Sequence, residues 1–373
     1  MPPASHEGPP EDKSIADRIL TEENPDGTKD PGRSRGTHER RAAGCRQSNT
    51  IMAACFHLQA PPALGGLVTP GKDSHPHTRI GVALSAGGAK GLAHIGVIQV
   101  LEENGIPVTA IAGTSMGAYV GGMWASGLNG EELEALAATM VQRSDLWSLV
   151  DPALPPRRGF IHGRKILKRL RHTLGEKTFE DLAKPFFCVA TELNGYVRSV
   201  LHEGDVASAI LASLSIPGIV VPVMRDGIEY IDGGVSEPLP VNALRETGVV
   251  DKIIAVNVLP RPGEARRFKH TPKNYKPWRN PCSWLNQKVN LFARGNLLDI
   301  LRGAAMGSQM RLVERSASHA DLVIRAVSPM PRWHDYTSYR SYIELGRLAT
   351  EACLPEIRAL AGLSSETPTR KAS

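Results

Sequence analysis

The sequence lacks a hydrophobic run long enough to cross a membrane. No apolar stretch among its 373 residues approaches the roughly 20 residues that a membrane-spanning helix needs. The segment from Met1 to Thr50 is polar, so the apolar centre of a secretory signal peptide is missing as well. Cys45 and Cys55 each follow small residues, but not the apolar sequence that a lipoprotein signal requires. We therefore expect a cytoplasmic protein.

Cysteine is scarce, and its positions show no pattern. The five cysteines are scattered and odd in number, without Cys-x-x-Cys spacing, which argues against a disulfide framework or a zinc site. A reducing compartment is the better match to this usage. No group of His, Asp and Glu has the spacing of metal ligands either. We expect neither a metal nor another cofactor.

Residues 1–77 have few aromatic residues and no sustained helical or strand period. Pro, Gly, Ser, Glu, Arg and His dominate this stretch, a composition typical of a disordered tail. Translation from Met52 instead of Met1 is an open alternative. Residues 364–373 form a second tail, which leaves 78–363 as the folded domain.

Within residues 78–363, buried strands alternate with helices. Short apolar runs at 80–85 and 110–113 are typical of strands buried on both faces, and helical patterns follow at 93–104 and 116–125. This strand–turn–helix repeat predicts an α/β protein with a mostly parallel sheet. Further helices are predicted at 131–142, 163–174, 206–214, 239–246, 296–313 and 339–360, and further strands at 186–191, 197–202, 227–231, 252–258 and 321–326.

Gly113-x-Ser115-x-Gly117 lies between a predicted strand and a predicted helix. Small residues on both sides of a serine permit the sharp turn that exposes its hydroxyl as a nucleophile. The amides and the positive dipole end of the following helix would favour negative charge near Ser115. The pattern predicts a serine nucleophile.

A second glycine-rich turn comprises Gly87, Gly88, Ala89, Lys90 and Gly91. Its amides are suited either to an oxyanion or to a nucleotide phosphate. Neither dinucleotide nor P-loop spacing matches, because alanine occupies the first glycine position and the lysine precedes glycine instead of Ser or Thr. Nucleotide binding is therefore the weaker interpretation.

The serine needs a base, and two kinds are available. A Ser-Asp-His triad would use His270, His319 or His334, none of which follows a convincing strand end. Asp232 closes a predicted strand and precedes Gly233 and Gly234, which let other groups approach closely. A desolvated carboxylate can itself act as the base, because burial raises its pKa.

Together, the two glycine-rich turns and Asp232-Gly233-Gly234 resemble the patatin-like phospholipase family. The resemblance is close from Ile80 to Val258 and implies a three-layer α/β/α fold. It also implies Ser115 as nucleophile, Asp232 as its base, and an oxyanion hole formed by Gly87, Gly88, Ala89 and Lys90. The chain departs from the family at Ala86, where glycine is usual, and at Lys90, where arginine is usual. Alanine restricts the backbone only if its φ is positive.

The resemblance implies hydrolysis of fatty-acyl esters of phospholipids or lysophospholipids through an acyl-enzyme. Two alternatives stay open: a triad esterase, and a regulatory or scaffold protein that keeps the fold without catalysis. The residues do not indicate the head group, the acyl-chain length or the oligomeric state.

The segment 261–294 combines many cations with interleaved tryptophan and a single acid, Glu264. Cations attract anionic head groups, and tryptophan favours the membrane interface. We expect this segment to be an insertion in the sequence of the domain, and two interpretations stay open: peripheral contact with anionic membrane at the inner face, or a solvated surface insertion without such a role. Single-stranded nucleic acid is a weaker alternative, and we expect no nucleic-acid partner.

Overall fold

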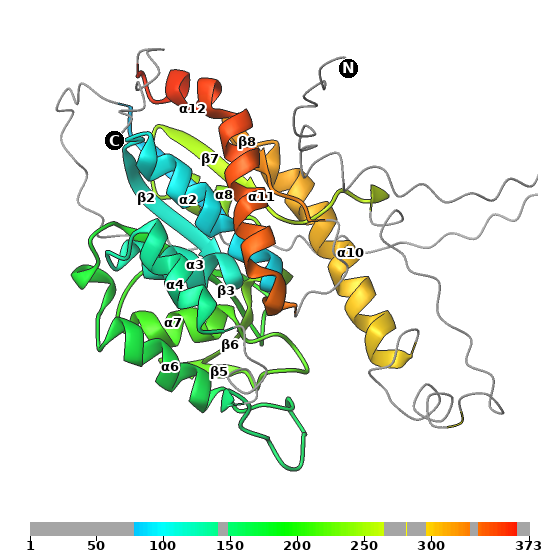
Figure 1. Ribbon diagram of the computed structural model, residues 1–373. Coiled ribbons are helices and arrows are strands. Elements are labelled where there is room, and N and C mark those ends of the chain that lie inside the picture. Colours follow the sequence, from blue (N-terminus) through cyan, green and yellow to red (C-terminus); the bar gives the residue numbers. More distant parts are fainter. Residues whose placement is uncertain (1–77, 141–147, 265–280, 282–295, 329–334, 364–373) are drawn as a thin grey trace, which may run out of the picture. The chain divides into compact units, whose positions relative to one another are not determined.

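The computed structural model describes residues 78–140, 148–264, 281, 296–328 and 335–363 (Figure 1). The predicted tails at 1–77 and 364–373 and residues 265–280 and 282–294 of the predicted insertion lie outside the described residues. The division into domain, insertion and tails therefore stays a prediction.

The described strands and helices follow the predicted alternation. The strands are β1 (Ile80–Leu84), β2 (Val108–Thr114), β3 (Phe186–Glu192), β4 (Arg198–Leu201), β5 (Val223–Arg225), β6 (Ile228–Asp232), β7 (Lys252–Asn257) and β8 (Leu322–Arg325). The α-helices are α2 (Ala93–Glu103), α3 (Met116–Ala125), α4 (Gly130–Ala138), α6 (Arg164–Leu174), α7 (Val206–Ser213), α8 (Val241–Glu246), α10 (Leu297–Ala317), α11 (Tyr339–Ala352) and α12 (Leu354–Leu360). Short 3-10 helices include η1 (Gly88–Leu92) and η3 (Gly233–Val235).

One mixed, mostly parallel sheet runs through the domain. Its strand order is β5-β6-β3-β2-β1-β7-β8, and β4 pairs with β3. The strands β3, β2, β1, β7 and β8 are parallel, whereas β4, β5 and β6 are antiparallel to their neighbours. The carboxyl ends of β2 and β3 therefore lie at the same edge of the sheet, and the site described below forms there.

Helices cover both faces of the sheet, as the three-layer prediction requires. On one face, large side chains of β1 such as Val82 and Leu84 pack with α2, α3, α7 and α11. On the other face, Ala83 packs with residues of α8 and α10. A Cβ added at Gly81 would lie 2.7 Å from a methyl group of Leu244 in α8. Strand β1 thus carries large residues toward one layer and small ones toward the other.

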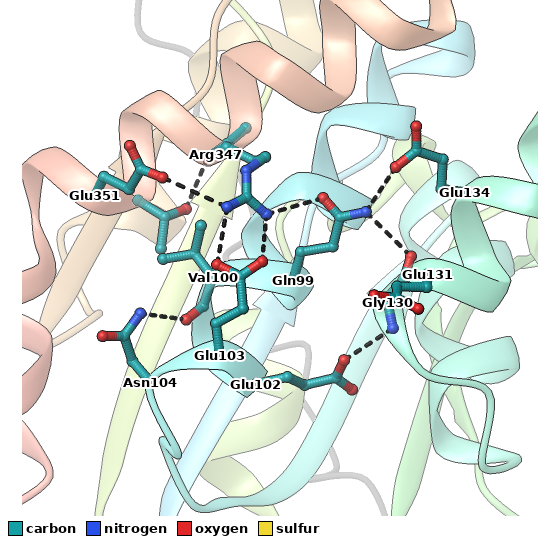
Figure 2. Close-up of polar contacts among 12 residues, drawn as sticks. Gln99, Val100, Glu102, Glu103, Asn104, Gly130, Glu131, Glu134, Arg347 and Glu351 are labelled. Carbon is teal, nitrogen blue, oxygen red and sulfur yellow. Dashed lines mark hydrogen bonds and ion pairs between the residues drawn. The ribbon is translucent and has the colours of Figure 1, made fainter. Parts of the chain in front are cut away.

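Helices α2 and α11 touch through their backbones. A Cβ added at Gly96 would lie 1.9 Å from the carbonyl oxygen of Ile343, and one added at Gly346 would lie 1.9 Å from that of Ala93. This approach brings polar side chains of the two helices into contact (Figure 2). Arg347 donates two hydrogen bonds to the carboxylate of Glu103 and one to the amide oxygen of Gln99.

The same network reaches a third helix. The amide nitrogen of Gln99 donates to the carbonyl oxygen of Gly130 and to the carboxylate of Glu134, both in α4 (Figure 2). Glu102 accepts from the amide of Gly130 and from the indole of Trp124. These contacts fix α2, α4 and α11 as one layer beside the sheet.

Two details differ from the sequence prediction. The predicted helix at 339–360 is two helices, because the chain turns at Cys353 before Pro355 enters the first turn of α12. Strand β5 was missed, since three residues are too short to show a period. Within the described residues, no helix combines the length and apolar character of a membrane span.

We expect Gly346→Ala to lower the free energy of unfolding by about 1–3 kcal/mol, because its methyl group would collide with the backbone of Ala93. Gly303→Ala is the matched control in α10, where an added Cβ meets nothing within 4 Å. That substitution should raise the free energy of unfolding by up to about 1 kcal/mol through helix propensity. Urea unfolding of both variants measures the difference, and equal effects would refute the backbone contact.

Candidate active site

Ser115 lies on a sharp turn between β2 and α3. Its backbone has φ 54° and ψ −119°, a strained conformation for a residue with a side chain. The turn is possible because glycines flank it: a Cβ at Gly117 would lie 2.2 Å from the carbonyl oxygen of Leu84. One at Gly113 would lie 2.4 Å from the carbonyl oxygen of Gly117. The predicted elbow is therefore present, and α3 begins directly after Ser115.

Asp232 reaches Ser115 from the end of β6. Strand β6 pairs with β3 so that Asp232 lies opposite Ala190, one residue beyond the pairing of β3 with β2. The hydroxyl of Ser115 donates a hydrogen bond of 2.6 Å to one carboxylate oxygen of Asp232. The amide of Gly234 donates to the other oxygen, also at 2.6 Å. Both oxygens of the carboxylate thus have a donor.

Gly233 permits this close approach. A Cβ at that position would lie 2.1 Å from the carbonyl oxygen of Val189 in β3. The backbone of Asp232 is held as well, because its amide donates to the carbonyl of Ser215 and its carbonyl accepts from the hydroxyl of Thr191. The Asp-Gly-Gly turn is consequently locked against β3 instead of being a loose surface turn.

Burial shifts the acidity of Asp232. Its exposed fraction is 4%, and that of Ser115 is 5%. Loss of solvation raises the pKa of Asp232 from 3.8 to about 6, even though the hydrogen bonds from Ser115 and Gly234 lower it. At neutral pH the carboxylate is mostly ionised and can accept a proton.

The first glycine-rich turn lies beside the elbow. A Cβ at Gly91 would lie 2.5 Å from the side chain of Met116, the residue after Ser115. Gly88 has φ 57°, which favours glycine, and a Cβ at Gly87 would lie 2.3 Å from Val258. Within the described residues, no acceptor takes the amide hydrogens of Gly87 or Gly88.

The alanine that departs from the family pattern fits this turn. Among the described residues, the side-chain-bearing ones with positive φ are Ser115, Tyr196 and Asp226, and Ala86 is not one of them. The amide of Ala86 donates to the carbonyl of Pro238 at 2.7 Å, which ties the turn to the segment after Asp232. The oxyanion role of Gly87, Gly88, Ala89 and Lys90 stays a prediction.

No described histidine hydrogen-bonds to Ser115 or Asp232. His319 contacts Asn242 and precedes β8, so it lies at the amino ends of the parallel strands, away from Ser115. His270 and His334 lie outside the described residues. Nor do three or more described His, Cys, Asp or Glu side chains form a group suited to a metal ion.

Sequence reasoning missed Ser213, the last residue of α7. Its hydroxyl accepts a hydrogen bond of 2.7 Å from the backbone amide of Ser115 and donates one of 2.6 Å to the carbonyl of Val189. Ser213 is fully buried. It therefore satisfies two backbone groups and holds the strained residue Ser115 against β3. A serine at a helix end carries no sequence signal for such a contact.

His94 was missed for the same reason. Its Nε2 donates to the carbonyl of Ser85 at 2.8 Å, and the Ser85 hydroxyl accepts from the amide of Val258. Burial lowers the pKa of His94 to about 4, so the ring is neutral at neutral pH. The ring positions the first glycine-rich turn and does not touch the Ser115–Asp232 pair.

These features define an α/β protein with a buried Ser–Asp pair on a nucleophile-elbow turn. Residues 82–245 match the family model described as patatin-like phospholipase. Residues 82–245 therefore form a patatin-like phospholipase domain.

The chain is also similar in sequence to proteins of mycobacteria and yeasts. The chain is 39% identical over 228 residues to uncharacterised NTE family proteins of Mycobacterium bovis and Mycobacterium tuberculosis, covering 61% of this chain and 59% of theirs. It is 33% identical over 180 residues to lysophospholipase NTE1 of Candida albicans, covering 48% of this chain and 13% of that protein. The chain thus spans about three fifths of the mycobacterial relatives and a small part of the yeast one.

Solved structures with some likeness include VipD from Legionella pneumophila, with a TM-score of 0.38 and 16% identity. That match covers 75% of this chain and 67% of VipD. The type III effector ExoU has a TM-score of 0.36 and 14% identity, with 75% of this chain and 53% of ExoU covered. Because these scores are low, the fold assignment rests on the sheet and on the family match.

We expect Ser213→Ala to slow covalent labelling of Ser115 by a fluorophosphonate about tenfold. The substitution leaves the amide of Ser115 and the carbonyl of Val189 buried without partners, a cost of about 1–3 kcal/mol. Ser215→Ala is the matched control, since that buried hydroxyl donates to the carbonyl of Leu211 in the preceding helical turn. Equal labelling rates in the two variants would show that Ser213 does not position Ser115.

Proposed function

We propose that this protein hydrolyses fatty-acyl esters of phospholipids or lysophospholipids, with Ser115 as nucleophile and Asp232 as base. The observation that carries the proposal is the 2.6 Å hydrogen bond from the Ser115 hydroxyl to the buried Asp232 carboxylate. A nucleophile and a base within hydrogen-bond reach are what acyl transfer requires.

Acylation begins when the Ser115 oxygen attacks the ester carbonyl carbon and its proton passes to Asp232. The carbonyl oxygen becomes an oxyanion, for which the amides of Gly87 and Gly88 are the proposed donors. As the intermediate collapses, the ester C–O bond breaks and the leaving alkoxide takes the proton from Asp232. The products of this step are the acylated serine and a free alcohol.

Deacylation repeats the sequence with water. A water molecule attacks the acyl carbon and gives its proton to Asp232, which then returns it to the Ser115 oxygen as the acyl–oxygen bond breaks. A fatty acid leaves, and the pair is restored. The raised pKa of Asp232 suits both roles, because the group must accept and release a proton near neutral pH.

The lipid substrate is inferred from the family and from the relatives. Residues 82–245 match patatin-like phospholipases, and the yeast relatives are named lysophospholipases. The buried apolar surroundings of Ser115, including Met116 and Tyr119 in α3, are compatible with an acyl chain. A cytoplasmic location with contact at the inner face of a membrane belongs to the same proposal.

We expect Ser115→Ala and Asp232→Asn each to lower turnover of a short p-nitrophenyl ester by roughly 10⁴-fold or more. His319→Ala is the control and should keep normal turnover, because it lies away from the pair. Circular dichroism checks that each variant is folded. Retained turnover in Ser115→Ala would exclude this serine as the nucleophile, and loss in His319→Ala would favour a triad.

The pH dependence follows from the pKa of Asp232. We expect kcat/KM to rise with pH through a midpoint near 6, because the protonated carboxylate cannot accept the serine proton.

The stability of the fold should depend on pH for the same reason. Because the pKa of Asp232 is higher in the folded than in the unfolded chain, ionising Asp232 reduces folding stability as pH rises from about 4 to about 6. The free energy of unfolding of Asp232→Asn minus that of wild type should therefore be larger at pH 8 than at pH 4. If this difference between variant and wild type does not change with pH, the group that titrates near pH 6 is not Asp232.

A further inference from the structure

The loop at 152–162 between the buried Asp151 and α6 exposes apolar and cationic side chains together. Leu154 is 83% exposed and Phe160 is 41% exposed. Arg157 and Arg158 lie between them, and no residue from 152 to 162 is acidic. In Figure 1 the loop extends away from the strands, next to α6 and β5. Large apolar residues gathered with cations on a surface loop are typical of a binding surface.

The loop lies at the edge of the sheet where Ser115 lies. The amides of Phe160 and Ile161 both donate to the carbonyl of Ile219, in the segment that follows α7. That segment begins where Ser213 holds Ser115 and where the carbonyl of Ser215 accepts from Asp232. Ile219, which holds the base of the loop, is therefore only four residues along the chain from Ser215, which holds Asp232.

Helix α6 adds cations at the same edge. Arg171, near its carboxyl end, pairs with Asp205, which caps the amino end of α7, so the two helices are antiparallel. The amino end of α6 consequently lies beside the carboxyl end of α7, where Ser213 lies. The exposed side chains of Arg164, Lys165 and Lys168 are in the first turns of α6.

Acids pair with only part of this charge: Glu229 pairs with Arg158 and Asp151 with Arg164, whereas Arg157, Lys165 and Lys168 form no ion pair among the described residues. Asp151 is buried and accepts from the amides of Gly163 and Arg164, which caps α6. Glu229 on β6 is paired with Arg158, and this pair ties the loop to the strand that delivers Asp232. The β5–β6 hairpin carries the exposed acid Asp226 on its turn and is not part of the surface.

We propose that the loop at 152–162 and the first turns of α6 form a docking surface for an anionic phospholipid bilayer. The proposal rests on the proposed lipid substrate, because a lipid must leave a bilayer close to Ser115 to be cleaved there. Leu154 and Phe160 enter the acyl boundary, while Arg157, Lys165 and Lys168 contact phosphate groups. The surface is distinct from the segment 261–294.

The test uses the full chain carrying Ser115→Ala, so that vesicles are not consumed and binding is read apart from turnover. Vesicles contain equal parts of phosphatidylcholine and phosphatidylglycerol, and binding is measured by flotation at low salt. We expect Leu154→Ser to weaken the vesicle partition coefficient several-fold, and Leu154→Ser with Phe160→Ser at least about tenfold. Leu348→Ser is the matched control on α11, since Leu348 is 46% exposed and lies outside this surface.

The charged part has its own matched pair. Lys168→Glu should weaken binding several-fold, and the loss should shrink as salt rises. Lys184→Glu makes the same charge change just before β3, at the opposite edge of the sheet, and should have a smaller effect. With Ser115 restored, all five variants, including the controls Leu348→Ser and Lys184→Glu, should turn over a soluble p-nitrophenyl ester normally.

Unchanged vesicle binding in Leu154→Ser and Lys168→Glu would overturn the docking surface. That outcome is expected if the segment 261–294 alone binds the membrane, so that its deletion abolishes binding. It is also expected if the loop binds a protein partner instead. Weakened binding in these variants supports the surface even if wild type cleaves no ester. Absent ester turnover in wild type refutes the proposed function instead. The two failures are thus distinguishable.

Discussion

The hydrogen bond between Ser115 and Asp232 joins positions separated by 117 residues of chain. Each end is held separately: Ser115 by the glycines of its turn and by Ser213, and Asp232 by the pairing of β6 with β3. Strand β3 contributes to both, because the carbonyl of Val189 accepts from Ser213 and lies directly against Gly233. A shift of β3 would separate the serine from the carboxylate.

The Ser115–Asp232 pair lowers the free energy of unfolding of the domain. Ser115 has an unfavourable backbone conformation, and Asp232 is ionised in a site nearly closed to water. Such costs persist only where the surroundings over-determine the geometry. Here the surroundings are tightly packed glycines, two buried serines and a neutral histidine, each with a defined hydrogen bond or backbone contact.

Much of this arrangement could be predicted from the sequence, because its signals are local. The apolar runs before Ser115 and Asp232 predicted their strands, and the glycines beside them predicted close backbone contacts. Ser213 and His94 could not be found, because their importance arises from contacts with Ser115 and Ser85 that only the folded chain creates. The same limit applies to Cys353, where two helices meet inside one continuous helical pattern.

The position of β7 has a consequence for folding during synthesis. β7 lies next to β1 in the interior of the sheet, and its end holds Ser85 through Val256 and Val258. A ribosome releases the segment carrying Ser115 long before it releases β7. The edge of β1 that pairs with β7 is apolar and stays unpaired in the nascent chain until β7 has been synthesised. More than 140 residues must follow Ser115 before Val258 is reached. Chaperones that recognise exposed strand edges would find their substrate in this interval.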